Sequence, residues 1–258
     1  MATRAKKDEV PVEIEIMNVE YGVATVYIKG RTPLILNKLS EKARHELLLP
    51  SPRKTAADRQ QSLKHNPADE FLAAAHMIPD DRAPTLLAIP TTALKGAMRD
   101  AALEAKGTSR SQIGRLTFIP GALLPVYGTP MIFLSVVRMA DPGRTPDIRT
   151  RVIVPEWATI AEITFMRPQL RAQSVVNLLH AAGLMMGCGD WRPQKGSGSY
   201  GQFEVLAEPD ADFNRIMKTG GRKAQVAAMK NPVAYDTETE ELLAWFTVEL
   251  RRRGIKAA

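Results

Sequence analysis

The stretch TLLAIPTTALKGAMRDAALEA, residues 85–105, predicts a strand that leads directly into a helix. The apolar run from Leu86 to Ile89 has the length of a short buried strand, and Pro90 ends it. Thr91 or Thr92 would then provide the N-cap of the helix. Its predicted inner face consists of apolar residues at helical spacing: Leu94, Ala97, Met98, Ala101 and Ala105.

The same helix carries two cations on its other side. Lys95 and Arg99 are four residues apart and therefore share an outward face. They could contact a phosphate backbone, or they could be ordinary solubilising residues of an amphipathic helix. Their spacing alone favours the solubilising role.

Around this unit the chain alternates between strand and helix patterns. Strands are predicted where β-branched and alternating apolar residues gather, at 12–16, 23–29, 131–139, 148–154, 157–166 and 202–206. Further helices are predicted at 40–48, 67–77 and 173–186. Without insertions the order is strand, helix, strand, strand, helix, strand, which predicts an α+β fold with an RRM/ferredoxin-like core.

We expect one domain with a helical extension. Residues 1–206 would form the core, interrupted by a proline-rich, basic insertion at about 50–67 that lacks large apolar residues. Residues 207–258 would form a helical C-terminal extension packed on the same domain. Its predicted helices lie near 210–218 and 237–253, joined by a basic connector from 220 to 230.

Composition excludes several classes of protein. The chain has 258 residues, and 35 lysines and arginines against 28 acidic residues give a net charge of +7, which attracts polyanions. The single Cys188 excludes an internal disulfide framework and fits the reducing cytoplasm. No apolar run reaches the ~18 residues of a membrane span, so we expect no membrane partner. Four scattered histidines argue against a zinc site, and we expect no metal and no cofactor.

The glycine-rich loop GCGDWRPQKGSGSYG, residues 187–201, is the sharpest candidate binding element. Glycines allow close backbone approach, exposed N–H groups bind anions, and aromatic rings can stack on bases. The predicted nucleic-acid-binding residues of the loop are Trp191, Arg192, Lys195, Gly196, Ser197, Gly198, Ser199 and Tyr200. The alternative is a plain connector in which Trp191 packs in the core. The spacing matches neither a P-loop nor a dinucleotide-binding motif, which argues against nucleotide hydrolysis.

A predicted hairpin over 138–151 supplies the remaining candidates. Its four arginines are Arg138, Arg144, Arg149 and Arg151. Arg149 and Arg151 would lie on one face of a strand and could follow a row of phosphates. The alternative is a solvated edge whose charge prevents aggregation.

Catalytic residues are not indicated. Asp190 has no partner acid or histidine placed by spacing, and Cys188 could act as a nucleophile only if His180 approached it. No constellation of catalytic groups emerges, so we expect a protein without enzymatic activity.

Two segments, IPTTALKGAMRDAA (89–102) and GDWRPQKGSGSYGQFEV (189–205), together resemble the RAMP superfamily of CRISPR effector proteins. The first resembles its Ile-Pro strand end and the Leu-Lys-Gly and arginine of its first core helix. The second resembles the family's glycine-rich loop, here ending in GSYGQF (198–203). The resemblance implies that Lys95, Arg99 and this loop contact RNA, and that the hairpin 138–151 is a thumb inserted between nucleotides.

The sequence also departs from that family. Its glycine-rich loop is longer and contains Trp-Arg-Pro, and no aspartate follows Lys29 where some relatives place an RNA-cleaving one. We therefore expect binding without cleavage.

The leading hypothesis is a guide-RNA backbone subunit that multimerises in a helical filament on single-stranded RNA, with other effector subunits as possible partners. The second is a phage or mobile-element single-stranded DNA-binding or annealing protein. The third is a structural assembly protein without nucleic acid.

Overall fold

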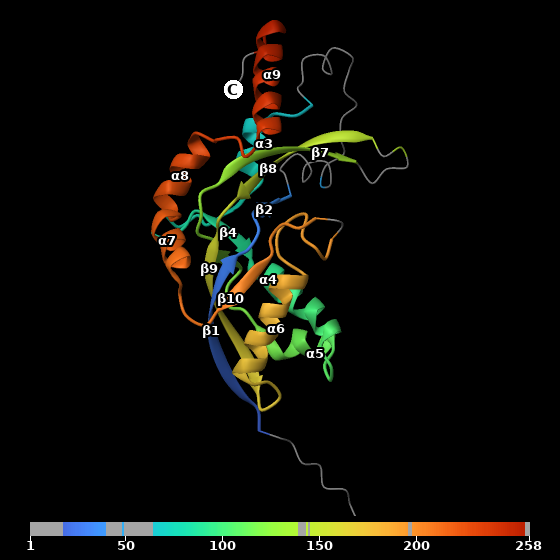
Figure 1. The fold of residues 1–258 in the computed structure, drawn as a ribbon, viewed down its shortest axis with the longest axis vertical. Coiled ribbons are helices and arrows are strands. Elements are labelled where there is room, and N and C mark those ends of the chain that lie inside the picture. Colours follow the sequence, from blue (N-terminus) through green and yellow to red (C-terminus); the bar gives the residue numbers. More distant parts are fainter. Residues whose placement is uncertain are drawn as a thin grey trace, which may run out of the picture.

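The computed structural model describes residues 18–39, 48, 64–138, 143, 145–195 and 198–255. It is a mixed α and β fold with antiparallel sheets, as the sequence predicts (Figure 1). No helix in these ranges has both the length and the apolar composition needed to cross a membrane.

A four-stranded antiparallel sheet forms the centre, in the order β10-β1-β9-β5. Its long strands are β1 (Glu20–Gly30) and β9 (Ala158–Arg167), which pair from Glu20↔Arg167 to Lys29↔Ala158. The short β10 (Phe203–Leu206) and β5 (Thr117–Phe118) lie at its two edges. The segment 117–118 was not predicted, because two residues give no readable periodicity.

Two helices cover one face of this sheet, α4 (Thr91–Ala101) between β1 and β5 in the chain, and α6 (Ala172–Met185) between β9 and β10. The predicted inner face of α4 is confirmed at Leu94, Ala97, Met98 and Ala101, all buried. Ala105 is exposed, because α4 ends at Ala101 and a short 3-10 helix (Ala102–Glu104) follows. The glycine at 183 lets α6 approach β10 closely, since a Cβ there would lie 2.2 Å from the carbonyl oxygen of Phe203.

The predicted hairpin is the main part of a second sheet, in the order β2-β8-β7. Strands β7 (Met131–Arg138) and β8 (Pro146–Val154) pair from Met131↔Ile153 to Arg138↔Pro146. The third strand, β2 (Leu34–Leu36), was not anticipated where the chain leaves β1.

A third small sheet contains β3 (His76–Met77), β4 (Leu87–Pro90) and β6 (Leu123–Pro125). The prediction of a helix over 67–77 is wrong at its end, because α3 (Pro67–Ala73) stops and His76 pairs with Ala88. The predicted threonine N-cap of α4 is also wrong. Pro90 occupies that position, and the Thr91 hydroxyl instead donates to the Gly121 carbonyl at 2.8 Å.

Three C-terminal helices follow the sheet: α7 (Ala211–Thr219), α8 (Arg222–Lys230) and α9 (Thr237–Arg252). The prediction of a basic connector over 220–230 is wrong, since most of it is α8. Buried Gln225 of α8 accepts from the backbone N–H groups of Leu86 and Leu87 and donates to the Val126 and Gly128 carbonyls. One side chain thus joins α8 to β4 and to the segment that follows β6.

Several predictions lie outside the described residues. These are the strand 12–16, the helix 40–48 except residue 48, most of the insertion 50–67, and the residues Arg144, Gly196 and Ser197.

Candidate nucleic-acid interface

A cationic depression lies between α4 and α5 (Arg110–Leu116). It has a volume of about 380 Å³, and its lining residues are Lys95, Arg99, Ser111, Gly114 and Arg115. The two cations predicted from the spacing of α4 therefore do share one surface. Three positive side chains and one hydroxyl, with no acidic lining residue, suit an anionic ligand.

The α5 half of this depression was missed in the sequence. Helix α5 begins after Ser109, whose hydroxyl accepts from the Gln112 backbone N–H at 3.2 Å. At Gly114 a Cβ would lie 3.2 Å from Nε of Arg99, so the glycine leaves room for that side chain to lie across α5. The Ser109 N-cap was the sequence signal for helix α5. This helix brings Arg115 to the depression.

Lys95 is positioned by the edge of the central sheet. Its ammonium lies 4.8 Å from the centroid of the Phe118 ring, within the range of a cation–π contact. Arg99 and Arg115 are exposed, and within the described residues neither guanidinium forms a hydrogen bond or ion pair. Their donors are therefore available to a ligand.

Asp100 connects the depression to the glycine-rich loop. Its carboxylate accepts a hydrogen bond from the Gln194 side chain of the loop and pairs with Arg110 of α5. The side chain of Asp100 is only 12% exposed, so this bridge is shielded from water. The loop, α4 and α5 consequently have a shared anchor.

The glycine-rich loop is an ordered structure in its described part. The Asp190 N–H donates to the Ile35 carbonyl at 2.9 Å, and the Gly201 N–H donates to the Pro33 carbonyl at 2.8 Å. Gly201 has φ +70°, and a Cβ there would lie 1.8 Å from the Cys188 carbonyl oxygen. The glycines thus permit a tight fold of the loop against β2.

Trp191 and Tyr200 pack against the second sheet. Their ring centroids lie 6.0 and 6.4 Å from that of Phe133, and Tyr235 lies 5.6 Å from Phe133 on another side. Both loop rings are half-buried, and burial is the main cause that raises the pKa of Tyr200. The aromatic cluster, Phe133, Trp191, Tyr200 and Tyr235, is therefore largely scaffold, as the connector alternative had suggested for Trp191.

Arg151 does not belong to an exposed phosphate row. It is 5% exposed, and its guanidinium donates to Asp190 at 2.8 Å and to Ser135 at 2.7 Å. The same group lies 4.7 Å from the centroid of the Trp191 ring. The prediction that Arg149 and Arg151 form one exposed row is corrected at Arg151, because the loop covers this position of β8.

The other candidate residues of the loop differ in exposure and in whether their side chains are already hydrogen-bonded. Arg192 donates to the Gly189 carbonyl at 2.8 Å and to the Gln194 side chain at 3.0 Å, so its guanidinium braces the loop internally. Lys195 and Ser199 are exposed. A Cβ at Gly198 would lie 1.8 Å from the Trp191 carbonyl oxygen, so this glycine closes the loop on itself.

On the hairpin, Arg138 is exposed, while half-exposed Arg149 pairs with Asp147 at 3.2 Å. Burial acts to raise the pKa of Asp147, but hydrogen bonds from Lys64 and His65 and the charge of Arg149 hold it below its ordinary value. Arg149, which pairs with Ser135 within the β7–β8 ladder, is thus partly neutralised.

The possible nucleophile has no activating environment. Cys188 is fully buried, and this burial raises the pKa of its thiol to about 12. The His180 ring instead accepts a hydrogen bond from the Val205 backbone N–H at 3.3 Å. Among the described residues, no group of three or more His, Cys, Asp or Glu side chains has the arrangement of a metal site.

Figure 1 shows α4, α5, the glycine-rich loop and the β7–β8 hairpin on one side of the molecule, with α7 and α8 on the other. The contacts of Gln194 with Asp100 and of Asp190 with Arg151 connect these elements in the same order. These two contacts link α4, the glycine-rich loop and the hairpin to one another.

No family model and no curated protein matches this chain. Among solved structures, it is similar to the crystal structure of Cmr6 from Pyrococcus furiosus, with 10% identity and a TM-score of 0.38, over 72% of this chain and 98% of that one. It is also similar to a chain of the type III-B Cmr-beta complex bound to cognate target RNA, with 14% identity and a TM-score of 0.38, over 72% of this chain and 59% of that one. Both likenesses in overall structure are remote.

Proposed function

We propose that this chain is a non-catalytic protein that binds single-stranded nucleic acid and multimerises along it, as a guide-RNA backbone subunit of a CRISPR-type effector. The observation that carries the binding proposal is the α4–α5 depression. Lys95, Arg99 and Arg115 converge there, and the two guanidiniums have no internal acidic partner among the described residues. Cations that remain unpaired in the folded protein are the ones that can exchange small counterions for phosphates.

The depression also offers room for a strand to pass closely. Gly96 of α4 stands beside these cations in the chain, and a Cβ there would meet no atom within 4 Å. A glycine inside a helix costs about 0.5–1 kcal/mol relative to alanine, and no packing requirement explains this one. Close approach of a ligand backbone to α4 would explain it.

Beyond the depression, we propose that the strand continues past Lys195 and Ser199 of the loop to Arg138 of the hairpin. All three are exposed, and Figure 1 shows the loop and the hairpin that carry them on the same side of the molecule as α4. The aromatic cluster would hold the loop in place and would not stack on bases, because its rings already contact one another.

The guide-RNA form of the proposal rests on the two motifs that resemble RAMP proteins. The strand order β10-β1-β9-β5, with α4 and α6 on one face, supports our proposal that the centre is an RRM-like core. The type III-B complex named above is bound to RNA, and we propose single-stranded RNA and other effector subunits as partners here.

The nucleic acid that co-purifies with the chain, analysed by nuclease sensitivity and length, tests this function. We expect RNA of discrete length, protected from nuclease with a regular repeat. Heterogeneous single-stranded DNA would instead support the phage or mobile-element alternative. A preparation free of nucleic acid that also binds no added single strand would contradict both.

A further inference from the structure

The central sheet leaves part of its longest strand without a neighbour. On one side β1 pairs with β9 along almost its whole length, from Glu20 to Lys29. On the other side it pairs with β10 only from Tyr27 to Gly30. Within the described residues, the stretch 20–26 therefore has a free edge, and alternate backbone N–H and C=O groups of a strand point to such an edge.

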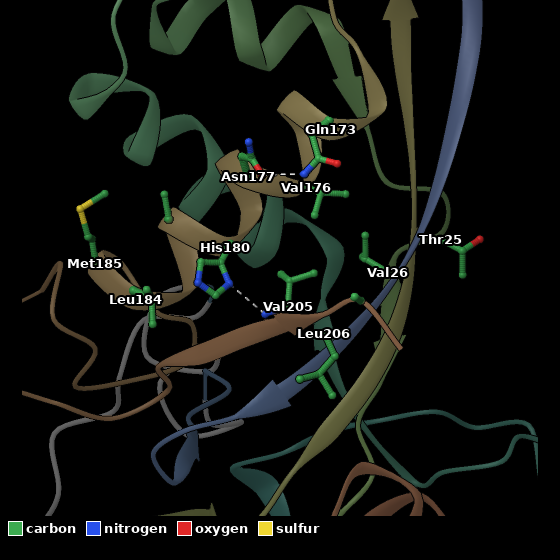
Figure 2. Close-up of a pocket in the computed structure, with 12 residues that line it drawn as sticks. Thr25, Val26, Gln173, Val176, Asn177, His180, Leu184, Met185, Val205 and Leu206 are labelled. Atoms are coloured by element: carbon green, nitrogen blue, oxygen red, sulfur yellow. Dashed lines mark hydrogen bonds between the residues drawn. The ribbon is translucent and has the colours of Figure 1, made fainter. Parts of the chain in front are cut away.

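A groove of about 690 Å³ opens beside this edge, between α6 and the strands β1 and β10 (Figure 2). Its apolar lining includes Val26, Val176, Leu184, Val205 and Leu206. Gln173, Asn177 and His180 of α6 add polar groups, and the lining contains no lysine, arginine or acid. A surface of this kind suits a peptide strand with one apolar side and does not suit a polyanion.

The chain itself contains a segment of matching chemistry. Residues 12–16, VEIEI, alternate apolar and acidic side chains, so that a strand formed by them would place Val12, Ile14 and Ile16 on one side. Five residues of strand span ~17 Å. The part of α6 that lines the groove, from Gln173 to Met185, spans ~18 Å at the rise of a helix. The length and the pattern of the segment both fit the groove.

The connection to β1 disfavours insertion of this segment into the groove of its own chain. A tight hairpin between residues 16 and 20 would need a residue with positive φ in its turn. Asn18 and Val19 are exposed, and neither has a positive φ. A two-residue hairpin turn at Asn18 and Val19 is therefore not formed.

We infer that the free edge of β1 and the α6 groove accept the Val12–Ile16 segment of a second copy of this chain, which adds a strand to the central sheet. This inference rests on the proposed multimerisation and identifies its interface. The contact is heterologous, since a segment of one copy meets the groove of the next, and such contacts produce open head-to-tail assemblies.

Two single variants of the full-length chain test the two halves of the contact. Ile14→Glu puts a charge on the apolar side of the segment, and Glu13→Gln is its control on the other side. Asn177→Trp fills the groove from the exposed face of α6, and Ser174→Trp is its control on the same helix outside the lining. By sedimentation velocity we expect I14E and N177W to be monomeric, whereas both controls assemble like the unmodified chain.

Mixing the two disabled variants gives a sharper test. N177W retains a competent segment and I14E retains a competent groove, so the mixture should form heterodimers and nothing larger. A disulfide between Ile16→Cys on one chain and Asn177→Cys on another should likewise form only in the mixture. Cys188 does not compete, because it is buried.

Three results would overturn the inference. The unmodified chain could stay monomeric with and without a long nucleic-acid strand, or I14E could assemble normally. A chain that carries both Ile16→Cys and Asn177→Cys could also form its disulfide within one molecule. Affinity for a strand of ~10 nucleotides, short enough for one copy, is measured in parallel. If the unmodified chain keeps this affinity but stays monomeric, or if I14E keeps both this affinity and normal assembly, the docking inference is wrong and the binding function stands.

Discussion

Two regions of this molecule contain the same side-chain types and use them in opposite ways. In the aromatic cluster, Arg151 lies against Trp191, is 5% exposed, and has Asp190 and Ser135 as hydrogen-bond partners. In the α4–α5 depression, Lys95 lies against Phe118, while the guanidiniums of Arg99 and Arg115 face solvent.

The difference separates scaffold from the proposed binding surface. An arginine with a carboxylate, a hydroxyl and a ring around it has few donors left for a ligand, and removing it takes the cation from a partly buried acid. An exposed arginine without an acidic neighbour contributes little to stability and keeps its charge for a polyanion. Effects on stability and effects on binding should therefore divide between the two regions.

The largest effect on stability is expected for Trp191→Ala. Loss of a Trp side chain from a packed site costs about 3–5 kcal/mol, and the lower end applies because Trp191 is half-buried. Chemical denaturation should show a loss of ~3 kcal/mol, with an affinity for short single strands close to that of the unmodified chain. The control Tyr21→Ala removes a ring that is 66% exposed and should cost less than ~0.5 kcal/mol. A stable W191A protein with weak binding would mean that this ring stacks on bases after all.

A second, smaller loss of stability is expected for Arg151→Met. The substitution keeps much of the side-chain volume but removes the cation from Asp190, which retains the hydrogen bond from Asn37 at 3.0 Å. We expect a cost of ~2 kcal/mol because Asp190 is also 30% exposed. Arg149→Met is the matched control on the same strand, and its half-exposed ion pair with Asp147 should be worth ~1 kcal/mol or less. Equal losses in the two variants, measured by the same denaturation, would remove the distinction between buried and exposed arginines.

The sequence predicted much of the fold and part of the site. The alternation of apolar residues identified β1, β7, β8 and β9, and the spacing of Lys95 and Arg99 identified the cationic face of α4. It could not identify β5 or α5, because both are short and are fixed by contacts with β9 and α4 that lie far away in the chain. Arg149 and Arg151 have the alternating spacing expected of two arginines that contact successive phosphates from one face of a strand. Only the packing of the glycine-rich loop shows that Arg151 is covered.

Gly96→Ala should change stability less, and in the opposite direction. Alanine inside a helix is more favourable than glycine, so we expect a gain of about 0.5–1 kcal/mol, since the new Cβ meets open space. If the strand passes closely over α4, the same methyl group should weaken binding. A variant that is more stable and binds equally well, in paired denaturation and fluorescence-anisotropy titrations, would place the ligand away from Gly96.

The smallest effect on stability for each position changed is expected for the triple variant Lys95→Ala, Arg99→Ala and Arg115→Ala, and this variant tests the central claim most directly. The measurement is the affinity for a fluorescent single strand of ~10 nucleotides over a series of salt concentrations, alongside the free energy of unfolding. Each phosphate contact on a single strand contributes about 0.7 to the slope of log K against log salt. We predict weaker binding and a slope reduced by ~2. The unfolding free energy should change by less than ~0.5 kcal/mol at exposed Arg99 and Arg115, and by about 0.5 kcal/mol at half-buried Lys95, which loses its contact with Phe118. An unchanged affinity and slope in a folded triple variant would contradict the assignment of the α4–α5 depression as the nucleic-acid interface.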